Sequence, residues 1–289
     1  VCSLARCVES DIRAAADALK DAVKPRIHVF IATSPVHRAA KLNMTREQVL
    51  EAAVRGVALA RSLCADVEFS CEDATRTEPD FLYQVCAAAI EAGAGTINIP
   101  DTVGYATVNE YGALIAGVKE HVVGSREVIL STHCHNDLGL ATATTLEALR
   151  RGARQVECTI NGLGERAGNA PLDEIVMGLR TRRDVYGLRD NLNTRELYRV
   201  SRLAAGLSLA LGCCLLPLLG GRLERAMERA QASTVYELLA RALGSPLALS
   251  ALAPLLGLFG VFLLAGCVGL LAKLASSAFS LAYNIAVYF

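Results

Sequence analysis

The sequence has no excess of charge of either sign. Lys and Arg together number 29, and so do Asp and Glu, so the 289 residues carry a formal net charge of zero. Proteins that bind nucleic acid or anionic membrane surfaces by charge carry a basic excess or a basic cluster. We therefore expect no nucleic-acid partner and no polybasic membrane patch.

The sequence also lacks a cysteine framework. Its ten Cys residues have no regular spacing, Cys213 and Cys214 are adjacent, and no C-x-x-C occurs. Scattered cysteines in a chain with enzyme-like patterning are typical of a reducing compartment. We therefore expect a cytoplasmic protein.

Two features are missing at the N-terminus, an initiator Met and a long apolar segment. Residues 1–6 (VCSLAR) contain no hydrophobic region of the kind that a signal peptide needs. We expect no signal peptide here, and we expect the chain to begin inside a longer protein.

Charged residues become sparse after Leu203, where Leu, Ala and Gly dominate. Residues 203–221 contain no charge over about 19 positions, close to the length that spans a bilayer, and 246–272 and 274–289 are also uncharged. We predict two domains, 1–203 and 204–289, the second an all-helical apolar tail apart from the first. Three alternatives stay open for the tail: membrane-spanning helices, a hydrophobic helical bundle, or a translated sequence that was never selected as protein.

The first 203 residues repeat one pattern, a β-branched run followed by a turn and an amphipathic helix. The repeat of roughly 30 to 40 residues is the size of a βα unit. Thr45 and Gln48 predict a capping box at the start of the second helix. The predicted strands are 26–33, 66–72, 96–101, 127–133 and 155–161, and the predicted helices are 7–23, 46–64, 79–92, 108–121, 141–151 and 172–186.

The strands read as buried rather than alternating, which is typical of a parallel sheet covered by helices. The fold class is therefore α/β, either a TIM barrel or a doubly wound sheet. No G-x-G-x-x-G follows the first predicted strand, which disfavours a dinucleotide-binding fold.

Polar residues cluster where the predicted strands end, above all in the stretch 133–137 (HCHND). Side chains alternate faces along a strand, so His133 and His135 point to the same side and can hold one metal ion. The alternative is that one ring is packed in the core and the other is exposed. In a barrel, all such strand ends meet at one face, which is where catalysis takes place.

Residues 131–139 (STHCHNDLG) and 161–169 (NGLGERAGN) resemble the 2-isopropylmalate synthase family of metal-dependent TIM-barrel enzymes. Segments 26–33, 68–74 and 98–104 match as well, so the resemblance runs from Val1 to about Leu203. The family's Arg-Asp-Gly motif, whose Asp binds the metal, does not occur, and residues 1–6 resemble the family's third strand. The resemblance therefore implies an incomplete TIM (β/α)8-type barrel that lacks about two N-terminal strands.

The resemblance also implies an activity and a role for individual residues. The enzyme would be an acyltransferase that condenses acetyl-CoA with a 2-oxo acid, 3-methyl-2-oxobutanoate, to give 2-isopropylmalate in leucine biosynthesis. It would use a divalent metal (Mn, Mg or Zn) and form a homodimer. Glu165 and Arg166 would also organise the loop that presents Asn169. The implied roles are metal ligand for His133, His135 and Asn169, substrate binding for His28 and Thr102, and catalysis for Glu72 and Glu165.

Several alternatives stay open. Homocitrate and citramalate synthases share the His-x-His pattern, and the general base is unassigned, with Glu72 as one candidate. The related lyases depend on a Cys in a Gly-rich loop, whereas 162–165 reads Gly-Leu-Gly-Glu here, which favours a synthase. The second function class is a non-catalytic membrane or interaction protein that retains a decayed barrel.

Overall fold

A computed structural model of the chain describes residues 1–210 and 285–288. The chain divides into two units. The first comprises Val1–Thr194 with Ala282–Phe289, and the second comprises Arg195–Leu281. In the second unit the described residues are 195–210, of which 197–210 are helical.

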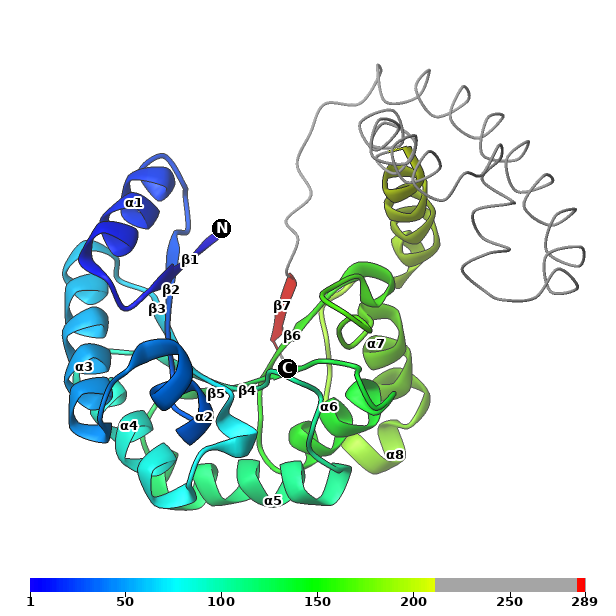
Figure 1. Cartoon of the computed structure of the whole chain (residues 1–289). Helices are drawn as coiled ribbons and strands as arrows, with labels where there is room; N and C mark the ends of the chain where they lie inside the picture. Colours follow the sequence, from blue (N-terminus) through cyan, green and yellow to red (C-terminus); the bar gives the residue numbers. More distant parts are fainter. Residues whose placement is uncertain (211–284, 289) are drawn as a thin grey trace, which may run out of the picture. The chain divides into compact units, whose positions relative to one another are not determined.

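One sheet forms the framework of the first unit, and its strands lie side by side in chain order. Strands β1 to β6 are mutually parallel, whereas β7 runs antiparallel to β6. Figure 1 shows that the sheet is curled and that the helices lie along its outer side. The strands are β1 (Cys2–Arg6), β2 (Arg26–Ala32), β3 (Val67–Glu72), β4 (Thr96–Asp101), β5 (Ile129–Cys134), β6 (Gln155–Cys158) and β7 (Ile285–Tyr288).

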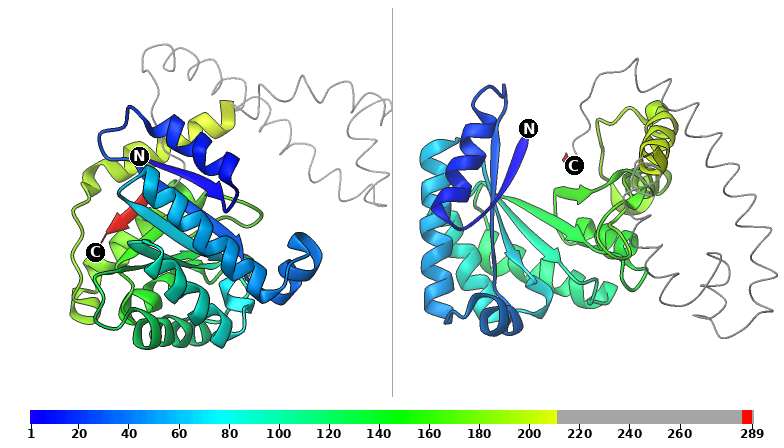
Figure 2. Two further views of the ribbon diagram at one scale, coloured as in Figure 1. Left: turned by 90° about the vertical axis from the view of Figure 1, so that its left-hand side faces the viewer. Right: turned by 45° about the horizontal axis from the view of Figure 1, so that its top comes forward.

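A helix follows each of the first six strands, as a βα repeat requires. Figure 2 shows from two further sides how these helices pack along the sheet. The α-helices are α1 (Glu9–Leu19), α2 (Pro35–His37), α3 (Arg46–Leu63), α4 (Pro79–Glu91), α5 (Val108–Val118), α6 (Ala141–Arg150), α7 (Leu172–Thr181) and α8 (Arg183–Tyr186). Short 3-10 or π elements are η1 (Arg38–Leu42), η2 (Ala74–Arg76), η3 (Lys119–Val123), η4 (Ile160–Gly162) and η5 (Thr194–Glu196).

Local signals explain several of these boundaries. The predicted capping box is confirmed, because Thr45 accepts the Gln48 N–H and Gln48 accepts the Thr45 N–H. The predicted strand 155–161 ends at Cys158, and the chain turns at η4, where Asn161 has a left-handed conformation with φ 57°. The predicted helix 172–186 is interrupted at Arg182, whose φ and ψ of −111° and 45° are not helical.

The two faces of the parallel strands differ in chemistry. On β3, Val67, Phe69 and Cys71 pack under the helices, whereas Glu68 and Ser70 belong to a hydrogen-bonded polar network inside the curl. The prediction that both faces are buried is confirmed, although side-chain polarity alternates along β3. Charged and amide side chains can alternate with apolar ones here because they satisfy one another's hydrogen bonds.

The α/β class and the incomplete TIM-type barrel are confirmed, since six parallel strands form an open, curled sheet. The prediction of an all-helical tail apart from the barrel is wrong for residues 285–288, which form β7 and pair with β6. Of the rest of the tail, residues 204–210 are helical and the remainder lies outside the described residues. No helix in 1–210 or 285–288 combines the length and apolar character needed to cross a membrane.

Candidate active site

His133 and His135 lie together where β5 ends. Their ring centroids are 4.9 Å apart, and the rings are arranged edge to face. His133 is the last but one residue of β5 and is paired in register with Glu157 on β6. His135 forms an isolated antiparallel bridge with Asn169, so the structure brings the three predicted metal ligands to one end of the sheet.

Each of the two imidazoles is held through its Nδ1 atom. His133 Nδ1 lies 2.8 Å from Glu157 Oε2, and His135 Nδ1 lies 2.6 Å from the carbonyl oxygen of Thr102. The Glu157 carboxylate accepts, so Nδ1 is the protonated nitrogen of His133 and the Nε2 lone pair of that ring is available to a metal ion.

Arg166 also approaches His135, with Nη2 2.7 Å from Nδ1. The same guanidinium donates to the Thr102 carbonyl oxygen and to both Asp137 carboxylate oxygens. Because a guanidinium only donates, His135 Nδ1 has a donor and an acceptor beside it, and these two contacts do not select one tautomer of His135. Burial, followed by the neighbouring His133, lowers the pKa of His135. The ring is therefore neutral near pH 7, as a metal ligand must be.

Asn169 is presented by a tightly turned loop. Arg166 and Gly168 have φ values of 53° and 94°, and a Cβ on Gly168 would lie 2.2 Å from the Gly162 carbonyl oxygen. The Asn169 amide donates from Nδ2 to the Leu163 carbonyl oxygen at 3.3 Å. Its Oδ1 is buried and has no hydrogen-bond partner among the described residues. A buried acceptor without a partner is costly, so this oxygen is available to a hydrogen-bond donor or to a cation.

These three groups fit a divalent metal of borderline character. Two imidazole nitrogens and one amide oxygen are all neutral donors, and imidazole suits zinc and its neighbours. The set contains no carboxylate, in line with the missing Arg-Asp-Gly motif. Hard cations such as Mg²⁺, which prefer carboxylate and water oxygens, fit less well.

A second group, His28, Glu68 and Glu157, also has ligand atoms within 4.8 Å of one another. Its carboxylate oxygens are already used, because Glu68 accepts from Arg26 Nη1 at 3.0 Å and from Gln155 Nε2 at 2.6 Å. Both Glu157 oxygens face histidine nitrogens. We therefore assign this group to the polar interior of the curled sheet.

The two carboxyl groups of this interior network have pKa values shifted in opposite directions. Burial is the main cause of the raised pKa of Glu68. Burial also acts to raise the pKa of Glu157, but His28, His133 and Asn98 outweigh it, so that this pKa is lowered. Glu157 therefore loses its proton more readily than Glu68 does.

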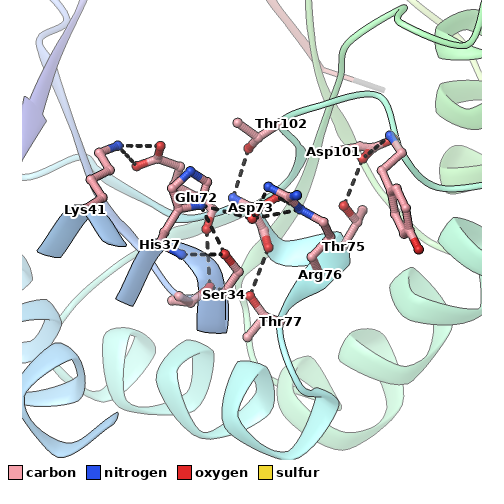
Figure 3. Close-up of polar contacts among 12 residues, drawn as sticks. Ser34, His37, Lys41, Glu72, Asp73, Thr75, Arg76, Thr77, Asp101 and Thr102 are labelled. Carbon is pink, nitrogen blue, oxygen red and sulfur yellow. Dashed lines mark hydrogen bonds and ion pairs between the residues drawn. The ribbon is translucent and has the colours of Figure 1, made fainter. Parts of the chain in front are cut away.

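A second polar cluster lies at the ends of β3 and β4 (Figure 3). Glu72 is paired with Lys41 of η1, whose Nζ is 2.6 and 2.8 Å from the two carboxylate oxygens. The Thr102 hydroxyl oxygen accepts the backbone N–H of Asp73 at 2.9 Å. These contacts place Glu72 and Thr102 on the same side of the sheet as the histidine pair, since the Thr102 carbonyl oxygen also contacts His135.

The backbone at Asp73 is left-handed, with φ 63°, and its buried carboxylate is held on two sides. His37 Nδ1 lies 3.0 Å from one carboxylate oxygen, and Arg76 donates from Nε to both oxygens. Burial acts to raise the pKa of Asp73, but Arg76 and Ser34 outweigh it and lower the pKa. The ionised Asp73 therefore fixes the turn that carries Glu72 and contacts Thr102.

The remaining two predicted site residues lie elsewhere. His28 is buried, and its ring contacts Ser70 Oγ through Nε2 at 2.6 Å and Glu157 through Nδ1 at 3.3 Å. The Glu165 side chain is 78% exposed and lies 3.3 Å from Arg166. The geometry therefore places His28 in the interior network and Glu165 on the outside of the Asn169 loop.

Sequence reasoning missed Glu157, Asn98 and Ser70, which connect the two histidines of the interior. Asn98 Nδ2 donates to Ser70 Oγ at 2.9 Å and to Glu157 Oε2 at 3.2 Å. A signal was present, because a charged residue in the middle of an apolar run such as VEC (156–158) is unusual in a buried strand.

The geometry agrees with comparisons to known proteins. The sequence profile described as HMGL-like matches residues 1–204. This chain belongs to the HMGL-like family. It is 58% identical over 204 residues to a 2-isopropylmalate synthase from Aquifex aeolicus and 56% identical over 208 residues to one from Carboxydothermus hydrogenoformans. The matches cover 70% and 72% of this chain but 39% and 41% of those proteins, so the chain spans about two fifths of their length.

Solved structures support the fold. A hydroxymethylglutaryl-CoA lyase from Pseudomonas aeruginosa superposes with a TM-score of 0.58 at 22% identity, over 74% of this chain and 69% of that one. An HMG-CoA lyase from Brucella melitensis gives a TM-score of 0.57 at 20% identity, over 71% and 73%. At these identities the likeness establishes the HMGL-like barrel architecture alone.

Proposed function

We propose that this chain carries the metal-binding part of a 2-isopropylmalate synthase-type active site. The observation that carries the proposal is the convergence of His133, His135 and Asn169 at one end of the sheet. His133 is held through Nδ1, which turns Nε2 to a ligand role, and the buried Oδ1 of Asn169 has no hydrogen-bond partner among the described residues. The high identity to proteins named 2-isopropylmalate synthase supports the same assignment. Acetyl-CoA and 3-methyl-2-oxobutanoate are the proposed substrates, and a cytoplasmic homodimer is the proposed state.

A bound divalent ion would supply Lewis-acid polarisation of the ketone of the 2-oxo acid. Thr102 is suited to hold the substrate carboxylate, because its oxygen accepts from Asp73 N–H and its own hydroxyl hydrogen can be donated. Glu72 is suited to act near the same substrate, since its carboxylate lies at the rim of the site. Its ion pair with Lys41 must open first, because both oxygens are occupied, and the Lys41 side chain is 49% exposed and can move away.

The first test is metal binding by the full chain, measured by competition with a chromophoric chelator. We expect Zn²⁺ to bind more tightly than Mg²⁺, because all three protein donors are neutral. His133→Ala and His135→Ala should each abolish the tight site, whereas His121→Ala should not. His121 is the matched control because its ring packs against Tyr83, with centroids 5.3 Å apart, away from the site.

The second test is thiol release from acetyl-CoA that depends on both 3-methyl-2-oxobutanoate and added metal. The chain lacks the Arg-Asp-Gly carboxylate, so we expect very slow turnover that the two histidine substitutions remove. Absence of a histidine-dependent metal site would refute the proposal and favour a non-catalytic protein that retains the barrel. Substrate preference for another 2-oxo acid would keep the chemistry and change the assigned reaction to a homocitrate or citramalate type.

A further inference from the structure

Glu157 holds two histidines at once. Its Oε2 lies 2.8 Å from His133 Nδ1, and its Oε1 lies 3.3 Å from His28 Nδ1. Glu157 and His133 are register partners on the adjacent strands β6 and β5, so the backbone itself keeps the two side chains beside each other. The Glu157 side chain is 11% exposed, which leaves little water to replace either contact.

The hydrogen-bond network has a self-consistent arrangement of protons around the Glu157 carboxylate. A carboxylate only accepts, so both histidines must donate from Nδ1. Nε2 of His28 can then accept the hydrogen of the Ser70 hydroxyl 2.6 Å away. Ser70 Oγ in turn accepts from Asn98 Nδ2, which also donates to Glu157. No donor in this chain of contacts meets another donor.

The arrangement has a consequence for His133. A neutral imidazole with its proton on Nδ1 must present a lone pair at Nε2, the nitrogen that the proposed metal site uses. In water the free ring exchanges between tautomers and orientations, so a fixed acceptor at Nδ1 selects one state before the ion arrives. Carboxylates that accept from metal-bound histidines act in this way and change metal affinity when they are removed.

We propose that Glu157 is a positioning residue, whose carboxylate fixes His133 in the tautomer that offers Nε2 to the metal and links that ring to His28. The inference rests on the proposed function, because the ion is the one assigned to His133, His135 and Asn169. Glu157 itself does not touch the ion or the substrate.

The test compares Glu157→Gln with Glu147→Gln in the full chain. Glu147 is the matched control because its side chain is also largely buried, at 10% exposure, but it contacts Arg150 and Arg151 at the end of α6 rather than a histidine. We expect Glu157→Gln to weaken Zn²⁺ binding by about 10- to 100-fold. Glu147→Gln should bind Zn²⁺ as the unchanged chain does.

The second measurement is the tautomer of His133 in the metal-free chain, read from the nitrogen chemical shifts of the labelled imidazoles. We expect the proton on Nδ1 in the unchanged chain and a mixture of tautomers in Glu157→Gln, with His135 unchanged in both. A proton on Nε2 of His133 in the unchanged chain would overturn the inference, even where a variant fails to fold. Equal Zn²⁺ affinity of Glu157→Gln and the unchanged chain would also overturn it, whereas no Zn²⁺ binding by either would instead refute the proposed function.

Discussion

Asn169 offers a test in which stability and metal binding move in different directions. In the metal-free chain, Asn169→Ala loses one hydrogen bond, from Nδ2 to Leu163, worth about 1 kcal/mol. It also removes the buried Oδ1 that has no partner among the described residues, a group that costs about 1 to 3 kcal/mol. The two effects nearly cancel or favour the variant, so we expect its metal-free unfolding temperature to be unchanged or a few degrees higher.

Added metal should make the unchanged chain more stable than Asn169→Ala. Zn²⁺ at about 100 times its dissociation constant stabilises the unchanged chain by about 2.7 kcal/mol. For a unit of roughly 200 residues this corresponds to an increase in unfolding temperature of about 5 to 11 °C. If Asn169→Ala weakens binding about 100-fold, the same Zn²⁺ concentration stabilises it by only about 0.4 kcal/mol, or about 1 to 2 °C.

The assay is thermal unfolding of both proteins by circular dichroism, with chelator and with Zn²⁺. Asn169→Asp provides the opposite case, because a buried carboxylate should lower the metal-free unfolding temperature and enlarge the response to Zn²⁺ and Mg²⁺. The reasoning fails if Asn169→Ala loses about 2 kcal/mol or more without metal and still shows the full Zn²⁺ response. Asn169 would then be a structural residue of its loop.

Three further outcomes are expected. Gly164→Ala should weaken Zn²⁺ binding in the chelator competition, because its Cβ would lie 2.3 Å from Asn169 Nδ2, whereas Gly95→Ala, whose Cβ would meet its nearest atom at 4.0 Å, should bind normally. Burial acts to raise the pKa of Glu78, but hydrogen bonds from two arginines outweigh it and lower the pKa to about 2. Ionised Glu78 therefore stabilises the folded state fully above its unfolded pKa of about 4.3, and this stabilisation is lost as the pH falls toward 2. Urea unfolding from pH 6 to pH 2.5 should therefore be less pH-dependent in Glu78→Gln, and an identical pH profile would contradict this. Tyr111→Phe should cost about 1 to 2 kcal/mol in urea unfolding, because the buried hydroxyl contacts the Ile99 carbonyl oxygen and Thr132, and a cost near zero would exclude that role.

The sequence predicts those structural features that are determined by residues adjacent in the chain. Helix starts follow from local capping, as at Thr45, and the strand before His133 follows from a short β-branched run. The histidine spacing predicts a shared face because strand alternation is a local rule. The resemblance adds Asn169, which the structure places opposite His135.

The parts that could not be predicted depend on register and on distance along the chain. Glu157 is 24 residues from His133, and their contact follows from how β5 and β6 align, which no local pattern specifies. The polar network on the inner side of the sheet also depends on distant residues, because Glu68 is stabilised by Arg26 and Gln155 from other strands. The pairing of residues 285–288 with β6 could not be predicted either, because no local sequence pattern in the two segments indicates that they pair.

The order of the strands has a consequence for how the molecule assembles during synthesis. From β1 to β6 each new strand pairs with the one made just before it, so every step closes a loop the length of one βα unit. Such short closures lose little chain entropy, so this part of the sheet can grow strand by strand from β1 to β6 in the order of synthesis. Strand β7 is separated from β6 by well over a hundred residues and can join only after these have been synthesised. Until then, the backbone of β6 presents a free edge in the nascent chain, the stage at which pairing with another chain competes with folding.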